Sequence, residues 1–167
     1  LRSITIKNFQ KVIKRAGITV SKITITQALK YAKAPAIKPN HADAYYNMGI
    51  ILTEQGKLEE AIVAYGKAIS TQPDYAKAYY NMGIILKEQS KLEEAIVAYN
   101  KAISIQPDYP EAYNNMGIIL KKQRKLEEAV VAYDKAISIK PDYAEAYHNM
   151  GNALQEHNKL KDAIKAY

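Results

Sequence analysis

A six-residue pattern recurs at a fixed spacing, and this recurrence constrains the fold more than any other feature of the chain. The pattern Ala-Tyr-x-Asn-Met-Gly lies at 44–49, 78–83, 112–117 and 146–151, always 34 residues apart. A fixed period of this length is typical of an array of structural units that stack and share one continuous core. We therefore predict four units, which span 42–75, 76–109, 110–143 and, incompletely, 144–167.

Within each unit, the spacing of apolar and small residues predicts two helices. Residues three, four and seven places apart share one face of a helix, and an apolar face must be buried. In the first helix of the first unit this face consists of Tyr45, Met48, Gly49 and Leu52. In the second helix, predicted from about Leu58 to Thr71, it consists of Ala61, Ala64, Tyr65 and Ala68. The glycine costs about 1 kcal/mol of helix stability, so we expect a neighbouring helix to approach closely there.

The period, these apolar positions and the helix-ending Pro73 resemble the tetratricopeptide repeat family. The resemblance covers 42–167. It implies an all-α fold, a right-handed superhelix of antiparallel helix pairs with a concave groove lined by the first helices. It also implies a function as a scaffold for protein–protein interaction, which binds a partner protein or an extended peptide in that groove.

Position 6 of every unit, counted from its first residue, is an asparagine on the face that the resemblance assigns to the groove. These residues are Asn47, Asn81, Asn115 and Asn149. An amide side chain offers donors and an acceptor that match the N–H and C=O groups of an extended peptide backbone. The ladder is similar to one in the repeat superhelix of O-linked N-acetylglucosamine transferase. The alternative is that each amide bonds a neighbouring helix or water.

Other residues of the same face surround the asparagines. They are Tyr46, Tyr80, Asn114 and His148 at position 5, Ile50, Ile84, Ile118 and Asn152 at position 9, and Lys87 and Lys121 at position 12. Aromatic side chains are favoured at interfaces and exposed apolar residues usually mark a contact surface, although each isoleucine could instead pack against an adjacent unit. Chaperone-binding members of the family hold a C-terminal carboxylate with Lys and Asn at positions 5 and 9. Tyr46 and Ile50 occupy those places here, so we expect no such clamp.

The basic excess of the chain lies entirely in its first quarter. Residues 1–40 hold nine basic and no acidic residues, whereas the other 127 hold 15 basic and 17 acidic ones, which accounts for the net charge of +7. We interpret 1–41 as a basic helical segment with a degenerate half repeat. Three roles remain open for it: a cap on the first repeat, a binding site for nucleic acid or an anionic surface through 1–38, or an organelle-targeting sequence.

Several other function classes are disfavoured by the sequence. The chain has no cysteine, no phosphate-binding glycine loop and no run of apolar residues long enough to span a membrane. His41, His148 and His157 share no metal-ligand spacing. We therefore predict no enzyme activity, no cofactor, no metal and no membrane span, and we expect a cytoplasmic location.

Two further hypotheses concern the setting of the array. The repeats could deliver substrates to the catalytic domain of a larger enzyme, such as a glycosyltransferase. The last repeat also lacks the polar capping helix that usually closes such arrays, and the first repeat could expose an apolar face as well. End-to-end stacking or dimerisation would bury these faces. Self-association through these ends is therefore a further expectation.

Overall fold

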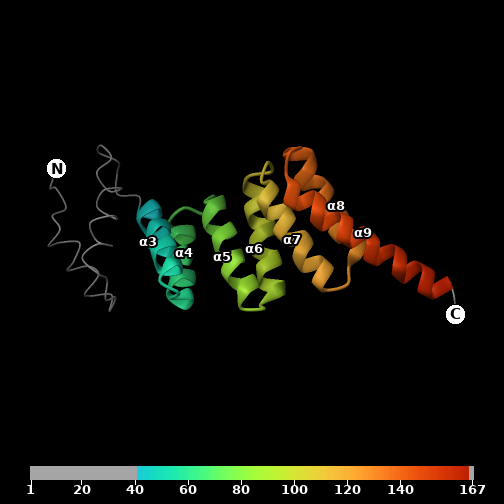
Figure 1. Ribbon diagram of the computed structural model, residues 1–167. Coiled ribbons are helices and arrows are strands. Elements are labelled where there is room, and N and C mark those ends of the chain that lie inside the picture. Colours follow the sequence, from blue (N-terminus) through green and yellow to red (C-terminus); the bar gives the residue numbers. More distant parts are fainter. Residues whose placement is uncertain (1–40, 166–167) are drawn as a thin grey trace, which may run out of the picture. The chain divides into compact units, whose positions relative to one another are not determined.

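The computed structural model describes residues 41–165, with side chains placed as far as Asn158. Within this range the chain forms seven α-helices and no strand (Figure 1), which confirms the all-α prediction. The helices are α3 (Ala42–Glu54), α4 (Leu58–Thr71), α5 (Ala76–Glu88), α6 (Leu92–Ile105), α7 (Pro110–Lys122), α8 (Leu126–Ile139) and α9 (Ala144–Lys165). The bounds of α4 are those that the sequence predicts. The basic segment predicted at 1–41 lies, except for its last residue, outside the described residues.

The chain divides into two compact units, at residues 1–72 and 73–167. In the first unit, α3 and α4 form a helical hairpin. In the second unit, α5 pairs with α6, α7 pairs with α8, and each pair packs against the helix that follows it. The alternate helices also touch, α5 with α7 and α7 with α9, so these three form one layer of the second unit.

A buried tyrosine of each complete hairpin packs on a glycine of the helix that precedes it. A Cβ atom added at Gly83 would lie 2.6 Å from Cε1 of Tyr99, and one added at Gly117 would lie 2.6 Å from Cε1 of Tyr133. The hairpin of α3 and α4 has the same arrangement. The close approach predicted at these glycines is therefore confirmed, and the tyrosine ring is its cause.

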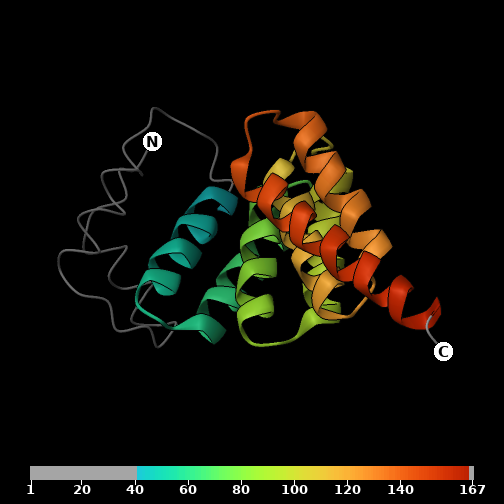
Figure 2. The ribbon, with the colours of Figure 1, turned by 45° about the vertical axis from the view of Figure 1, so that its right-hand side comes forward.

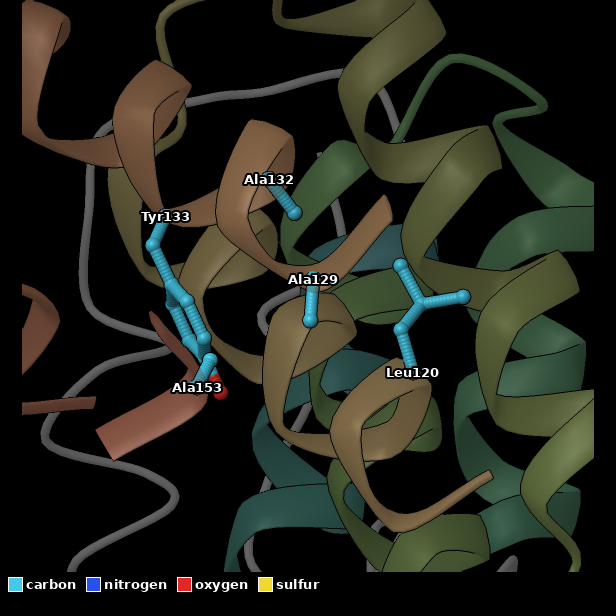
Figure 3. Packing of buried hydrophobic residues seen from close by; sticks show 5 residues of the cluster. All are labelled: Leu120, Ala129, Ala132, Tyr133 and Ala153. Carbon is cyan, nitrogen blue, oxygen red and sulfur yellow. The ribbon is translucent and has the colours of Figure 1, made fainter. Parts of the chain in front are cut away.

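The core of the second unit continues from one hairpin to the next helix. Its cluster near the C-terminal end comprises Leu120, Ala129, Ala132, Tyr133 and Ala153, which come from α7, α8 and α9 (Figure 3). Met116 and Met150 pack against this cluster from α7 and α9. The small residues let the helices lie close together, and the tyrosine ring fills the remaining space. Within the second compact unit, packing of each repeat against the next helix therefore completes the burial of the predicted apolar faces.

The first helix of each complete hairpin ends in the same tight turn. The backbone N–H of Lys91 donates to the carbonyl of Leu86 (2.9 Å), and that of Ser90 donates to the carbonyl of Lys87 (3.0 Å). This is the Schellman pattern, which satisfies the last carbonyls of a helix and needs one residue of positive φ. The residue of positive φ is Gly56 after α3 (71°), Ser90 after α5 (60°) and Arg124 after α7 (64°). Two of the three turns therefore place a side chain where the backbone favours glycine.

Replacing Ser90 with glycine is expected to raise the free energy of unfolding by about 1 kcal/mol, because a left-handed conformation costs an L-residue roughly that amount. Urea denaturation followed by circular dichroism measures the change. Ser104→Gly is the matched control, since Ser104 is exposed within α6, and glycine there should lower stability by about 0.5 kcal/mol. Two changes of the same sign would contradict this explanation of the turn.

The fourth repeat differs from the other three. The sequence predicts two helices in each unit, yet α9 continues as one helix from Ala144 to Lys165 (Figures 1 and 2). The helix therefore runs through the position at which Gly56, Ser90 and Arg124 make the turn in the other three repeats, where this repeat has Asn158.

Candidate functional site

Most of the residues predicted to contact a ligand lie half-exposed on the first helices. In the second unit they form a row along α5, α7 and α9, which we call the first-helix face. Its half-exposed members are Tyr80, Asn81, Ile84, Lys87, Asn115, Ile118, Lys121, Asn149 and Asn152. In the first unit, Tyr46, Asn47 and Ile50 are half-exposed on α3. Two predicted residues of the second unit differ in burial, because Asn114 is buried and His148 is exposed.

Asn115 of α7 joins two side chains of α5. Its Oδ1 accepts a hydrogen bond from Nζ of Lys87 (2.6 Å), and its Nδ2 donates to the hydroxyl oxygen of Tyr80 (3.1 Å). The centroid of the Tyr80 ring lies 4.7 Å from that of Tyr109, which supports the ring from the turn before α7. An amide group has two N–H donors and two acceptor lone pairs. These contacts engage one of each and fix the orientation of the amide.

Asn114 lies between α7 and α9 and is only 1% exposed. Its Nδ2 donates to Oε1 of Glu145 (3.1 Å), and its Oδ1 accepts from Nδ2 of Asn149 (3.1 Å). In this structure, Asn114 therefore links two repeats and does not face solvent. The alternative stated for the ladder, in which an amide bonds a neighbouring helix, is seen at both Asn115 and Asn149.

Two further predicted contact residues have neighbours within the protein. Ile118 packs against the cluster around Tyr133 and remains half-exposed, so it both packs and contributes apolar surface. On α9, Nδ2 of Asn152 lies 3.0 Å from Nε2 of His148, one turn earlier. The fourth repeat therefore presents an amide, Asn152, at the position where the other repeats present isoleucine.

Burial changes the ionisation of two residues on this face. It lowers the pKa of Lys87, although the carboxylates of Glu88 and Glu145 act in the opposite direction. It also raises the pKa of Tyr80 to about 12, an effect that nearby Tyr143 and Glu111 strengthen. The phenol of Tyr80 therefore stays protonated at neutral pH, and its oxygen accepts a hydrogen bond from Asn115 while its proton remains available to another acceptor.

A depression of about 390 Å³ lies at the end of this face, between α7, α8 and α9. It is lined by Ile118, Lys121, Lys122, Arg124, Tyr133, Asn149 and Glu156. Ile118, Lys121 and Asn149 were predicted as contact residues from their repeat positions, but Arg124 and Glu156 were not. Arg124 could have been found by comparing the repeats, because it stands at the turn position that Gly56 and Ser90 occupy in the first and second repeats. A basic residue there adds charge to the rim without a structural need for it.

No group of three or more His, Cys, Asp or Glu side chains in the described part of the chain is arranged to hold a metal ion. Among the helices described here, none is long and apolar enough to cross a membrane. The features that remain are a row of amide, aromatic and apolar side chains and one basic depression.

Family models match the chain over most of its described length. A model described as TPR repeat matches residues 49–90, 85–124 and 120–158, and one described as Tetratricopeptide repeat matches 31–63. These matches together cover more than half of the chain. No curated protein matches it in a sequence comparison.

Solved structures of similar fold cover most of the chain. The crystal structure of MamA has a TM-score of 0.71 and 25% identity, covering 96% of this chain and 81% of its own. The first TPR of Spaghetti (RPAP3), bound to the HSP90 peptide SRMEEVD, has a TM-score of 0.69 and 24% identity, covering 75% of this chain and 99% of its own. The TPR2B domain of yeast Sti1, in a complex with pHsp70, has a TM-score of 0.65 and 22% identity, covering 69% of this chain and 97% of its own. The all-α solenoid predicted from the repeat is thus the fold of these structures.

Proposed function

Because the chain belongs to the tetratricopeptide repeat family, we propose that its first-helix face binds a partner protein in extended form. The observation that carries this proposal is the row of half-exposed amide, tyrosine and isoleucine side chains on three adjacent helices. Such a mixture of polar-tipped aromatic and apolar groups is typical of a binding surface. The complexes of RPAP3 and Sti1 with chaperone peptides support the use of this fold for peptide capture.

The geometry of the asparagines favours contact with a peptide backbone. Asn115 is oriented by Lys87 and Tyr80, and Asn149 is oriented by Asn114. Each of these bonds engages only part of what the amide offers, because a side-chain amide has two donors and two lone pairs. A side chain that is already oriented loses less conformational entropy when a ligand binds. The contacts within the protein therefore prepare the ladder for a ligand.

The residues at positions 5 and 9 argue for a recognition mode other than the capture of a chain terminus. Tyr80 stacks on Tyr109, Asn114 is buried, and Ile84 and Ile118 are apolar. These side chains supply no cation where chaperone-binding members of the family place their carboxylate clamp. We infer that affinity comes from backbone contacts with the amides and from apolar contact with the isoleucines, so that the ligand is bound along its length.

Replacing both Asn81 and Asn115 with alanine is expected to weaken peptide binding about a hundredfold. Two amides that each lose one or two hydrogen bonds cost about 3 kcal/mol in total, which corresponds to that factor. The probe is a pool of random, unstructured peptides selected on the unmodified protein, with affinities measured by fluorescence anisotropy. Circular dichroism reports whether helicity is retained in the variant.

Asn100→Ala is the matched control for this experiment. Asn100 is an exposed asparagine of α6, away from the first-helix face, and its replacement should leave affinity unchanged. If the double variant keeps its helicity and still binds the selected peptides as tightly as the unmodified protein, the role proposed for the ladder is wrong.

A further inference from the structure

The basic depression at the end of the first-helix face contains a buried hydroxyl group without a partner. Tyr133 is 0% exposed, it lines the depression, and its hydroxyl oxygen makes no hydrogen bond. In the first unit, the equivalent Tyr65 has its hydroxyl 3.4 Å from Oγ1 of Thr53. Lys121 stands at the place of Thr53 in this repeat, and an ammonium group cannot accept a hydrogen bond. The Tyr133 O–H is therefore a donor that lacks an acceptor, a state uncommon for a buried group. The hydroxyl of Tyr99 in the preceding repeat, where Lys87 replaces the threonine, is in the same state, so it is the surrounding cations that distinguish Tyr133.

The charges around this hydroxyl favour an anion as the missing acceptor. Lys121, Lys122 and Arg124 contribute three cations to the lining, and Asn149 adds an amide. Burial, with the nearby carboxylates of Glu156 and Glu145, raises the pKa of Tyr133 to about 12. The phenol therefore keeps its proton at neutral pH and can donate it in a hydrogen bond.

Glu156 already places a carboxylate at the edge of this cluster. Its Oε1 lies 3.1 Å from Nζ of Lys121, and its Oε2 lies 3.6 Å from Nη1 of Arg124. The residue at the same position one repeat earlier is Lys122, so the fold itself does not require an acidic side chain there. The side chains of Glu156 and Arg124 are exposed to 37% and 69%, and that of Lys121 is half-exposed, and ion pairs open to solvent contribute little to stability. Glu156 is therefore a carboxylate that another one could replace.

We propose that this depression binds an acidic side chain of the extended partner, and that Glu156 occupies its cations in the free protein as an internal competitor. The ligand would be a glutamate or aspartate within the bound segment, because Ile118 and Asn149 belong both to the depression and to the first-helix face. A backbone running along that face carries its side chains past the opening. The proposal rests on the proposed function, since it assumes that this face holds the ligand.

The test uses a short oligoglutamate with an acetylated N-terminus and an amidated C-terminus, so that only side-chain carboxylates are offered. Oligoglutamine of equal length is the neutral probe. Binding to the full chain is followed by two-dimensional NMR of backbone amides. Glu156→Gln removes the competitor, and oligoglutamate is expected to bind this variant about fivefold more tightly than the unmodified protein, a factor in keeping with the loss of one exposed ion pair. The amides that shift should belong to 118–124 and 149.

Two further substitutions test the individual parts of the depression. Adding Lys121→Gln to Glu156→Gln should abolish the gain, and adding Tyr133→Phe should reduce it about threefold, because a phenyl ring fills the same space without a donor. Lys135→Gln is the matched control, since Lys135 is an exposed lysine of α8, and it should leave the gain unchanged. Equal affinity of the unmodified protein and the Glu156→Gln variant would overturn the proposal, as would equal binding of oligoglutamine.

Failure of this proposal can be told apart from failure of the proposed function. If Asn81→Ala with Asn115→Ala leaves peptide binding unchanged while Glu156→Gln still gains affinity for oligoglutamate, then the ladder is refuted and the acidic subsite stands. If the asparagine variant loses peptide binding while Glu156→Gln gains nothing, the subsite alone is refuted.

Discussion

Replacing Gly117 with alanine is expected to lower the free energy of unfolding by about 1–3 kcal/mol. The new methyl group would lie 2.6 Å from Cε1 and 2.8 Å from Cδ1 of Tyr133, a buried ring that belongs to the core cluster. Either the ring must leave its position or α7 must move away from α8, and both changes disrupt close packing. The steric cost exceeds the gain of about 1 kcal/mol that alanine brings to a helix over glycine. Urea denaturation measures the difference.

The matched control is Gly66→Ala in α4. No atom lies within 4 Å of a Cβ added at Gly66, so only helix propensity acts there. This variant is expected to be more stable by about 1 kcal/mol. Opposite signs for the two glycines would support the steric argument, whereas a stabilised Gly117→Ala variant would show that the ring of Tyr133 can move at little cost.

Replacing Tyr99 with alanine is expected to cost about 3–5 kcal/mol, the range observed when a large aromatic side chain is removed from a core. Tyr99 is 0% exposed and packs on Gly83, and its ring centroid lies 5.9 Å from that of Tyr80. A repeat array is stabilised mainly by contacts within and between neighbouring repeats, so this loss should unfold the hairpin of α5 and α6, which Tyr99 and Gly83 hold together. Thermal and urea denaturation measure the change.

Two controls separate the ring of Tyr99 from its hydroxyl and from exposed tyrosines. Tyr99→Phe keeps the ring and removes a hydroxyl that has no hydrogen-bond partner, so its stability should lie within about 0.5 kcal/mol of the unmodified protein or above it. Tyr147→Ala removes a ring that is 52% exposed on α9, and it should also have a small effect. A large loss in Tyr99→Phe would mean that the hydroxyl, and not the ring, holds the hairpin together.

The repeat determined most of what could be predicted about the helices. The apolar spacing at Ala61, Ala64, Tyr65 and Ala68 places α4 and its buried face, because helical periodicity is a local property of the chain. The glycine at position 8 also predicted the close approach of a neighbouring helix, and the structure identifies the tyrosine ring as what lies there. The family model and the fold of the solved structures agree with the predicted array of helix pairs.

The candidate site could be predicted only in part, because some of its residues depend on contacts between repeats. Position 5 is half-exposed Tyr80 in the second repeat and buried Asn114 in the third. The buried amide of Asn114 donates to Glu145, which lies 31 residues away in the sequence. The pairing of Lys121 with Glu156 likewise joins successive repeats. Periodicity predicts which face of a helix each position occupies. It does not predict which side chain of the next repeat will contact that position, because tertiary packing decides this.

The ring of Tyr133 also limits how closely the neighbouring helices can approach one another. It packs on Gly117 of its own hairpin, and it belongs to the same buried cluster as Ala153 of the next helix (Figure 3). An aromatic ring is rigid, unlike a flexible aliphatic side chain, so close packing around it limits how near α7, α8 and α9 can approach one another. Packing in the core therefore contributes to the spacing between Asn115 on α7 and Asn149 on α9. A ligand bound along these amides, as proposed above, would have to match that spacing, although it would not touch the ring that maintains it.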